Sequence, residues 1–117
     1  MSDVSTEFRE PTTPERRLLA FLVRKAQPLQ LPPGGLEKLM VQNMADGGMG
    51  SLKLWLPGMA TEPRVFGKMV SDHKFTDDDG VAVIASLNVD HNGELMELDM
   101  WKTDFSPVIR IPEILDE

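Results

Sequence analysis

The residues best suited to chemistry are carboxylates and amides with the spacing of a calcium-binding loop. Asn88, Asp90 and Asn92 stand where the first three ligands of such a loop stand. Gly93 follows at the sharp turn, and Asp99 occupies the place of the final carboxylate. Asn88 replaces the usual first Asp, so the loop has one negative charge fewer. Asp99 replaces the usual last Glu, so a shorter side chain must supply the final carboxylate. Divalent metal binding by these residues is one hypothesis, and a β-hairpin with an Asn-Gly turn is the favoured interpretation.

A second acidic cluster reads Asp77-Asp78-Asp79-Gly80. The carboxylates of Asp77 and Asp79 could hold a hard cation such as Mg²⁺ or Ca²⁺. Asp and Gly in succession are more typical of turns, because Asp side chains accept hydrogen bonds from nearby backbone N–H groups. A turn is therefore favoured, and a metal-binding protein or metal-dependent enzyme using these loops is the alternative function.

The remaining motifs predict structure rather than catalysis. Residues 46–51 lack the Lys of a P-loop and lead into a strand, which favours a bulged hairpin over a phosphate cradle. His73 and His91 lack the spacing of a zinc site. The chain has no Cys, which excludes disulfides, thiolate metal sites and a Cys nucleophile. We assign no catalytic residue and no cofactor, and a non-enzymatic protein is favoured.

One helix is expected near the N-terminus. Thr12 can cap it, Pro14 suits its first turn, and Glu15 favours the positive end of the helix dipole. The helix is predicted to run from Pro14 to about Gln27, with an apolar stripe made of Leu18, Leu19, Leu22, Val23 and Ala26. Residues 1–11 are predicted to be a flexible arm, and residues 12–117 a single domain.

Strands follow the helix. Alternating apolar residues predict strands over 52–56, 81–89 and 96–100, and a weaker pattern predicts one over 65–75. Residues 36–44 fit either a helix or a strand, and residues 108–111 fit a short edge strand. The fold class is therefore α+β, with the N-terminal helix packed on an antiparallel, mostly meandering sheet of about four or five strands.

The last two long strands form the predicted hairpin around Asn92-Gly93. With this turn at the tip, one face pairs Val89 with Met96, Leu87 with Leu98, and Ala85 with Met100. The other face pairs Asp90 with Leu95, Asn88 with Glu97, Ser86 with Asp99, and Ile84 with Trp101. Since a slip by one residue would reverse the two faces, the apolar pattern sets the register.

The charge of the chain is concentrated around this hairpin. The 12 Lys and Arg residues against 19 Asp and Glu give a net charge of −7. The stretch from residue 72 to 104 contains two bases, Lys74 and Lys102, and nine acids, which are Asp72, Asp77, Asp78, Asp79, Asp90, Glu94, Glu97, Asp99 and Asp104. The favoured interpretation of the polar hairpin face is a solvent-exposed surface that keeps the protein soluble. The functional hypothesis is a docking surface of Ile84, Glu97, Asp99 and Trp101, and a further alternative is a helix that covers this face.

Two segments of the sequence resemble the signature blocks of a small bacterial domain family of unknown function. They are DGGMGSLKL at residues 46–54 and GELMELDMWKTDFSPVIRIP at residues 93–112, in which ELDxWKxDFSP is the more specific part. The resemblance implies a bacterial origin and carries no activity, cofactor or site residue with it.

The function best supported by these patterns is a non-enzymatic protein-binding module that uses an acidic sheet face. A basic protein is the expected partner, since the net negative charge argues against nucleic acid and anionic membranes. In size and charge the chain is analogous to small acidic inhibitors that neutralise basic toxins. Self-association of the basic helix with the acidic sheet is a third possibility. The polar start of the chain and the short apolar runs predict a cytoplasmic protein.

Overall fold

The computed structural model describes residues 8–26, 29, 31, 35–58 and 64–115. The predicted arm over residues 1–11 and the Pro-rich connector therefore lie largely outside the described residues. Helix α1 spans Thr13–Lys25. It begins with a capping box, in which the Thr12 hydroxyl accepts from the Glu15 N–H and the Glu15 carboxylate accepts from the Thr12 N–H at 2.8 Å. The predicted helix is confirmed, and it ends at Lys25.

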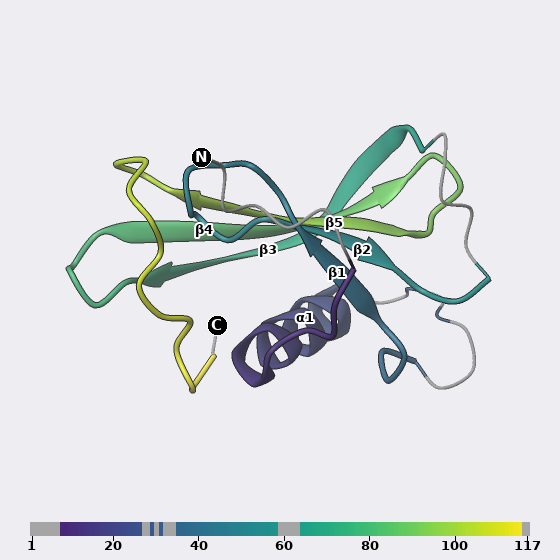
Figure 1. Ribbon diagram of the computed structural model, residues 1–117, viewed down its shortest axis with the longest axis horizontal. Coiled ribbons are helices and arrows are strands. Elements are labelled where there is room, and N and C mark those ends of the chain that lie inside the picture. Colours follow the sequence, from purple (N-terminus) through teal and green to yellow (C-terminus); the bar gives the residue numbers. More distant parts are fainter. Residues whose placement is uncertain (1–7, 27–28, 30, 32–34, 59–63, 116–117) are drawn as a thin grey trace.

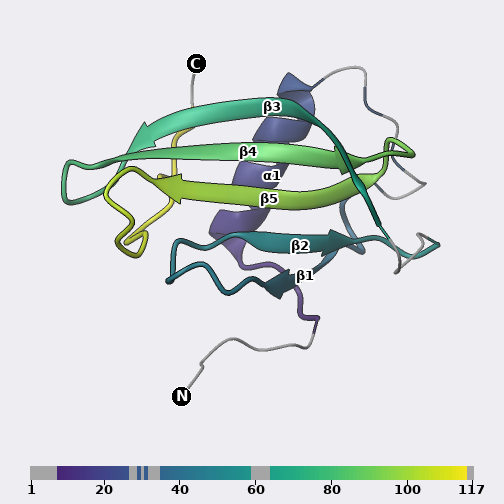
Figure 2. The ribbon, with the colours of Figure 1, turned by 90° about the horizontal axis from the view of Figure 1, so that it is seen from above.

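Five strands form one antiparallel sheet in the order β1-β2-β5-β4-β3 (Figure 2). They are β1 (Met40–Asn43), β2 (Leu52–Trp55), β3 (Phe66–Thr76), β4 (Ala82–Asp90) and β5 (Leu95–Lys102). The α+β class is thus confirmed, and the strand β1 settles the open question over residues 36–44. The sheet combines a β1–β2 hairpin with a β3–β4–β5 meander, and β2 joins the two by pairing with β5.

The predicted register of the β4–β5 hairpin holds except next to its turn. Ile84 pairs with Trp101, Ser86 with Asp99 and Leu87 with Leu98, but Val89 pairs with Leu95 instead of Met96. The cause is a three-residue loop in place of the expected two-residue turn. Gly93 closes this loop with φ of 82°, and its N–H donates to the Asp90 carbonyl. A bulge between Asn88 and Val89 then restores the predicted pairing.

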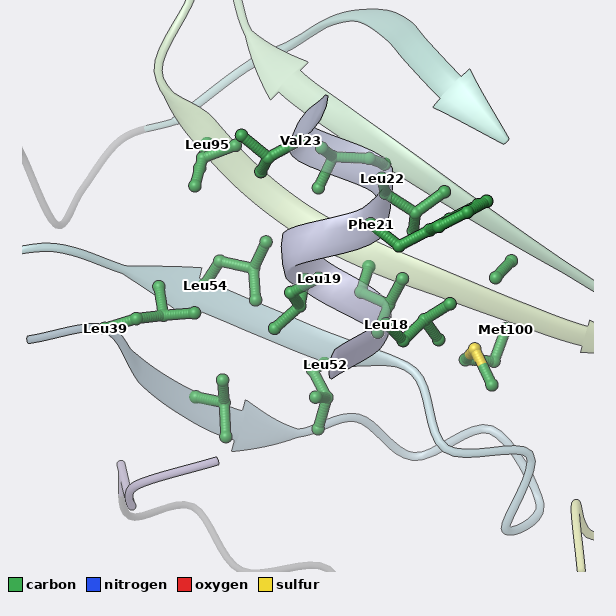
Figure 3. Packing of buried hydrophobic residues seen from close by; sticks show 14 of the residues in the cluster. Leu18, Leu19, Phe21, Leu22, Val23, Leu39, Leu52, Leu54, Leu95 and Met100 are labelled. Atoms are coloured by element: carbon green, nitrogen blue, oxygen red, sulfur yellow. The ribbon is translucent and has the colours of Figure 1, made fainter. Parts of the chain in front are cut away.

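The hydrophobic core lies between α1 and one face of the sheet (Figures 1 and 3). Leu18, Leu19 and Leu22 of α1 have no solvent exposure, and they pack over the inward residues of the strands. The buried apolar strand residues are Val41, Leu52, Leu54, Phe75, Val83, Ala85, Leu87, Val89, Leu95, Leu98 and Met100. The opposite face of the sheet carries no helix among the described residues, and we call it the open face (Figures 1 and 2).

The C-terminal segment, residues 103–115, has no strand, so the predicted edge strand over 108–111 is wrong. From the end of β5 it crosses the end of the sheet toward the start of α1, shown in yellow in Figure 1. Near its end, the Pro112 carbonyl accepts a hydrogen bond from the Arg17 guanidinium at 3.4 Å. The segment therefore joins the sheet to the helix without extending the sheet.

Candidate functional site

The four candidate binding residues lie together on the open face. Ile84 stands directly opposite Trp101 on neighbouring strands, and Glu97 and Asp99 precede Trp101 at alternate positions of β5. Their neighbours Leu98 and Met100 are buried in the core on the other side. Because side chains alternate between the faces of a strand, the pairing alone places all four on one surface. The covering helix considered as an alternative lies on the other face of the sheet.

Trp101 has an aromatic neighbour that the sequence patterns did not single out. The ring centroids of Trp101 and Phe105 are 6.3 Å apart, and 41% of Trp101 and 68% of Phe105 are exposed. Phe105 has φ of 65°, an unfavourable conformation for a bulky side chain. The turn is held by the Asp104 carboxylate, which accepts from the N–H and the hydroxyl of Ser106 at 3.0 and 2.6 Å. A strained, exposed aromatic side chain next to another is a candidate for a functional residue.

The charge on the open face is local and mixed. Asp99 and Asp72 flank Ser86 on β5 and β3, and both are exposed. Among the described residues, neither carboxylate has a hydrogen bond or an ion pair. Lys53 faces Glu97 across β2 and β5, and Lys74 faces Ile84 across β3 and β4. The face thus offers one acidic row beside an apolar end, with lysines at two of its borders.

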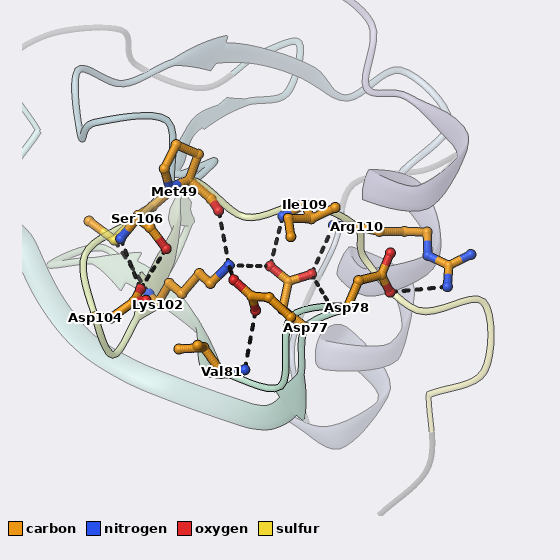
Figure 4. A network of polar contacts seen from close by, with 11 residues as sticks. Met49, Asp77, Asp78, Val81, Lys102, Asp104, Ser106, Ile109 and Arg110 are labelled. Carbon is orange, nitrogen blue, oxygen red and sulfur yellow. Dashed lines mark hydrogen bonds and ion pairs between the residues drawn. The ribbon is translucent and has the colours of Figure 1, made fainter.

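Most other acids of the 72–104 stretch have partners within the protein. The Lys102 ammonium lies 2.9 Å from the Asp77 carboxylate and 2.7 Å from that of Asp79, as Figure 4 shows for the Asp77 pair. Lys102 and the Asp77 side chain have no solvent exposure. Asp78 forms an ion pair with Arg110 at 3.1 Å. The cluster at residues 77–79 is a turn, as favoured from sequence, and its acids neutralise a buried lysine.

The buried pair also fixes the C-terminal segment (Figure 4). The Asp77 carboxylate accepts from the Ile109 N–H at 2.7 Å and from the Arg110 N–H at 3.1 Å, and the Pro107 carbonyl accepts from Lys102 at 3.1 Å. Burial alone would raise the pKa of Asp77, but the backbone donors and the Lys102 ammonium outweigh it and lower the pKa to about 2. Burial alone would lower the pKa of Lys102, whereas Asp79 and Asp77 raise it. We call this arrangement the Asp77–Lys102 clamp.

Alternation could have revealed Lys102 from sequence. Leu98 and Met100 occupy inward positions of β5, and Lys102 is the next inward position. A buried lysine requires an acidic partner, and the Asp cluster at residues 77–79 is the nearest acidic turn in the hairpin that precedes it. No sequence pattern could have identified the partner of Arg64. This residue precedes β3, outside any alternating pattern, and it pairs with Asp90 at the end of β4.

The residues of the calcium-like pattern have other partners. One Asp90 oxygen accepts from the N–H groups of Asn92 and Glu94, and the other lies 3.3 Å from the Arg64 guanidinium. Burial would raise the pKa of Asp90, but these donors lower it. The Asn88 amide donates to Glu97 at 3.1 Å. In the described part of the chain, no group of three or more His, Cys, Asp or Glu residues could hold a metal ion.

The two histidines have different surroundings in the fold. His73 lies on β3, and its ring packs edge-on against Phe21 of α1 with centroids 4.7 Å apart. His91 is exposed in the β4–β5 loop, where its backbone N–H donates to the Val65 carbonyl. The fold does not bring the two imidazoles into one site.

The two signature segments meet at one place in the fold. The Ser51 hydroxyl accepts from the Met100 N–H at 2.9 Å and donates to the Met100 carbonyl at 3.3 Å. The Val108 N–H donates to the Gly48 carbonyl, and a Cβ on Gly48 would lie 3.2 Å from the Pro107 ring. The glycine turn and the C-terminal segment therefore pack against each other beside the Asp77–Lys102 clamp.

Together these features define an α+β protein with one helix on a five-stranded open sheet and a clamped C-terminal segment. The chain belongs to the family described as Domain of unknown function (DUF6984), whose model matches residues 8–112. No curated protein and no solved structure matches the sequence. Across the described residues, no helix has the length and apolarity that a membrane crossing requires.

Proposed function

We propose that the protein is a non-enzymatic binding module whose open face binds a basic protein. The binding surface comprises Ile84, Glu97, Asp99 and Trp101, with Phe105 at its apolar end. The observation that carries the proposal is the exposed Trp101–Phe105 pair, in which Phe105 keeps an unfavourable backbone conformation. Exposed aromatic anchors of this kind dominate the energy of many protein interfaces.

The charge of the surface supports a basic partner. The carboxylates of Asp72 and Asp99 have no partner among the described residues, so a Lys or Arg side chain of another protein could pair with both across Ser86. Such pairs mainly guide the encounter and fix the orientation of the partner, and aromatic burial contributes most of the affinity. A partner segment with a basic residue next to an apolar one fits this arrangement.

The test is capture of a partner from lysate of the native host by four immobilised proteins. Wild type and Glu113→Lys should retain the same salt-eluted protein, whereas Trp101→Ala and Asp99→Lys should lose it. Asp99→Lys and Glu113→Lys change the net charge equally and both positions are exposed, so the comparison separates the local surface from the overall charge.

The captured protein is then purified and its affinity is measured directly. We expect Trp101→Ala to weaken binding by at least about tenfold, as for a typical aromatic hot spot. Circular dichroism of each variant checks that the fold is kept. Equal binding by all four proteins, or no salt-eluted partner at all, would contradict the proposal.

A further inference from the structure

A cavity of about 400 Å³ opens where β2 and β5 meet the N-terminal segment. Its lining includes Phe8, Lys53, Trp55, Arg64, Met96 and Glu97. The volume lies in the range of small-molecule sites, which are about 300–1,000 Å³. This cavity lies at the β2 side of the open face and is separate from the Trp101–Phe105 pair at the far end of β5.

One wall of the cavity is aromatic and apolar. The rings of Phe8 and Trp55 have centroids 6.3 Å apart, and 43% of Phe8 is exposed. Met96 is only half-buried, because the bulge in the β4–β5 pairing gives the inward position to Leu95. These three side chains offer a surface for an apolar or aromatic group.

The same cavity holds polar groups without partners. The indole N–H of Trp55 has no acceptor among the described residues, but this atom is fully buried and is not open to a ligand. Lys53 and Glu97 face each other across the strands, yet among the described residues no ion pair joins them and the Lys53 ammonium group has no hydrogen bond. Glu97 uses one oxygen for the Asn88 amide, and its second oxygen accepts no hydrogen bond in the described part of the chain.

Arg64 supports the cavity without being available to a ligand. Its guanidinium donates to the carbonyl groups of Leu54 and Leu95 and to the Asp90 carboxylate. Among the described lining residues, the charged groups without an ion-pair partner are therefore one cation, Lys53, and one anion, Glu97, side by side. A ligand that satisfies both must carry a negative and a positive group close together.

We propose that this cavity binds a free amino acid with an apolar or aromatic side chain. The α-carboxylate pairs with Lys53, the α-ammonium pairs with Glu97, and the side chain lies against Phe8, Trp55 and Met96. This inference does not rest on the protein-binding proposal, because the two sites share only Glu97, the aromatic anchors of the protein-binding surface lie at the other end of β5, and the readouts differ.

The first experiment titrates L-phenylalanine into ¹⁵N-labelled protein and follows the two indole N–H signals by NMR. Trp55→Phe assigns the Trp55 signal by its loss. Saturable movement of the Trp55 signal is expected, with the Trp101 signal unmoved. No saturable movement up to about 10 mM ligand, a concentration that detects millimolar affinity, would overturn the proposal.

Two analogues test recognition of the head group. 3-Phenylpropionate lacks the ammonium group and phenethylamine lacks the carboxylate, and each should bind at least about tenfold more weakly than L-phenylalanine, as expected for loss of a charged hydrogen bond. If all three compounds bind alike, the cavity recognises only an aromatic ring and the proposal fails.

Variants connect the binding to the named side chains. Lys53→Gln and Glu97→Gln should each weaken L-phenylalanine binding about tenfold, whereas Lys38→Gln, an exposed lysine in a turn outside the cavity, should not. Trp55→Phe should also weaken L-phenylalanine binding, because it shortens the aromatic wall of the cavity beside Phe8. Unchanged binding by Trp55→Phe would contradict the role of this wall.

Discussion

Lys102 and Asp77 are the two residues whose burial most constrains the molecule. An ammonium group without solvent exposure needs oxygen ligands, and Lys102 has the carboxylates of Asp77 and Asp79 and the carbonyl of Pro107. Asp77 differs from Lys102 because backbone N–H groups also bind it. The two residues should therefore respond unequally to substitution.

Asp77→Asn should lower the free energy of unfolding by about 3–5 kcal/mol, because it leaves a buried ammonium group with a single carboxylate and places an amide against backbone donors. Lys102→Met should cost less, since Asp77 keeps three backbone N–H donors. Urea unfolding of the three proteins measures the order. A larger loss in Lys102→Met than in Asp77→Asn would contradict this account.

The lowered pKa of Asp77 predicts loss of stability in acid. Its folded pKa of about 2 lies below the ordinary value of 3.8, so its contribution is present above pH 3.8 and is lost as the pH falls toward 2. Melting temperatures measured between pH 5 and pH 2 should fall more steeply for wild type than for Asp77→Asn, which has no carboxylate to titrate at this position. Parallel curves would show that Asp77 does not carry the effect.

At the scale of elements, the β4–β5 register could be predicted because its two apolar patterns and its turn residues agree. The loop length was predicted one residue too short, because Asn-Gly also fits a three-residue loop in which Gly93 takes the left-handed conformation and Asp90 binds the loop N–H groups. The β2–β5 pairing has no such local signal. It depends on contacts between residues more than forty positions apart, such as Ser51 with Met100.

The C-terminal segment shows why a strand pattern over residues 108–111 failed. Three of its four residues are β-branched, as is typical of strands, but the backbone N–H groups of Ile109 and Arg110 donate to the Asp77 carboxylate and are not available to a neighbouring strand. The candidate residues Ile84, Glu97, Asp99 and Trp101 could be placed from sequence because they follow from the register. Phe105 could not, since its exposure depends on the turn after β5.

The packing between the turn at residues 46–50 and the C-terminal segment can be tested with alanine variants of two neighbouring glycines. Gly48→Ala and Gly47→Ala both place a side chain at positive φ, which costs about 1–2 kcal/mol. Only at Gly48 does the new Cβ come within 3.2 Å of Pro107, whereas at Gly47 it meets no atom within 4 Å. Gly48→Ala should therefore be the less stable variant in urea unfolding. Equal losses of unfolding free energy in the two variants would show that Pro107 moves away from the new Cβ without destabilising the protein.

At the scale of the whole molecule, the structure changes the meaning of the net charge of −7. Asp77 and Asp79 neutralise a buried lysine, Asp78 pairs with Arg110, and Asp90 pairs with Arg64. The acidic stretch between residues 72 and 104 is thus partly internal. Among the acids of this stretch without an ion pair in the described part of the chain, three lie on the open face, namely Asp72, Glu97 and Asp99.

Three of the four basic residues of α1 also have partners within the protein, so we expect a monomer. Arg16 pairs with Glu10, Arg17 donates to Pro112, and Lys25 donates to the Asp72 carbonyl. Few helix charges remain to attract the acidic face of a second copy. Sedimentation equilibrium between about 0.05 and 0.5 M salt should give the monomer mass of 13.1 kDa throughout. A mass that rises at low salt would favour self-association of helix and sheet.

The Asp77–Lys102 clamp also has a consequence for variation and engineering. It holds the C-terminal segment through backbone groups only, namely the Pro107 carbonyl and the N–H groups of Ile109 and Arg110. Any residue supplies a backbone carbonyl, and any residue other than proline supplies a backbone N–H. The side chain of Ile109 is 58% exposed and takes no part in it. The clamp fixes the path of the segment and leaves its outward side chains open to change. This stretch is therefore a natural place to graft a foreign peptide epitope onto a rigid scaffold.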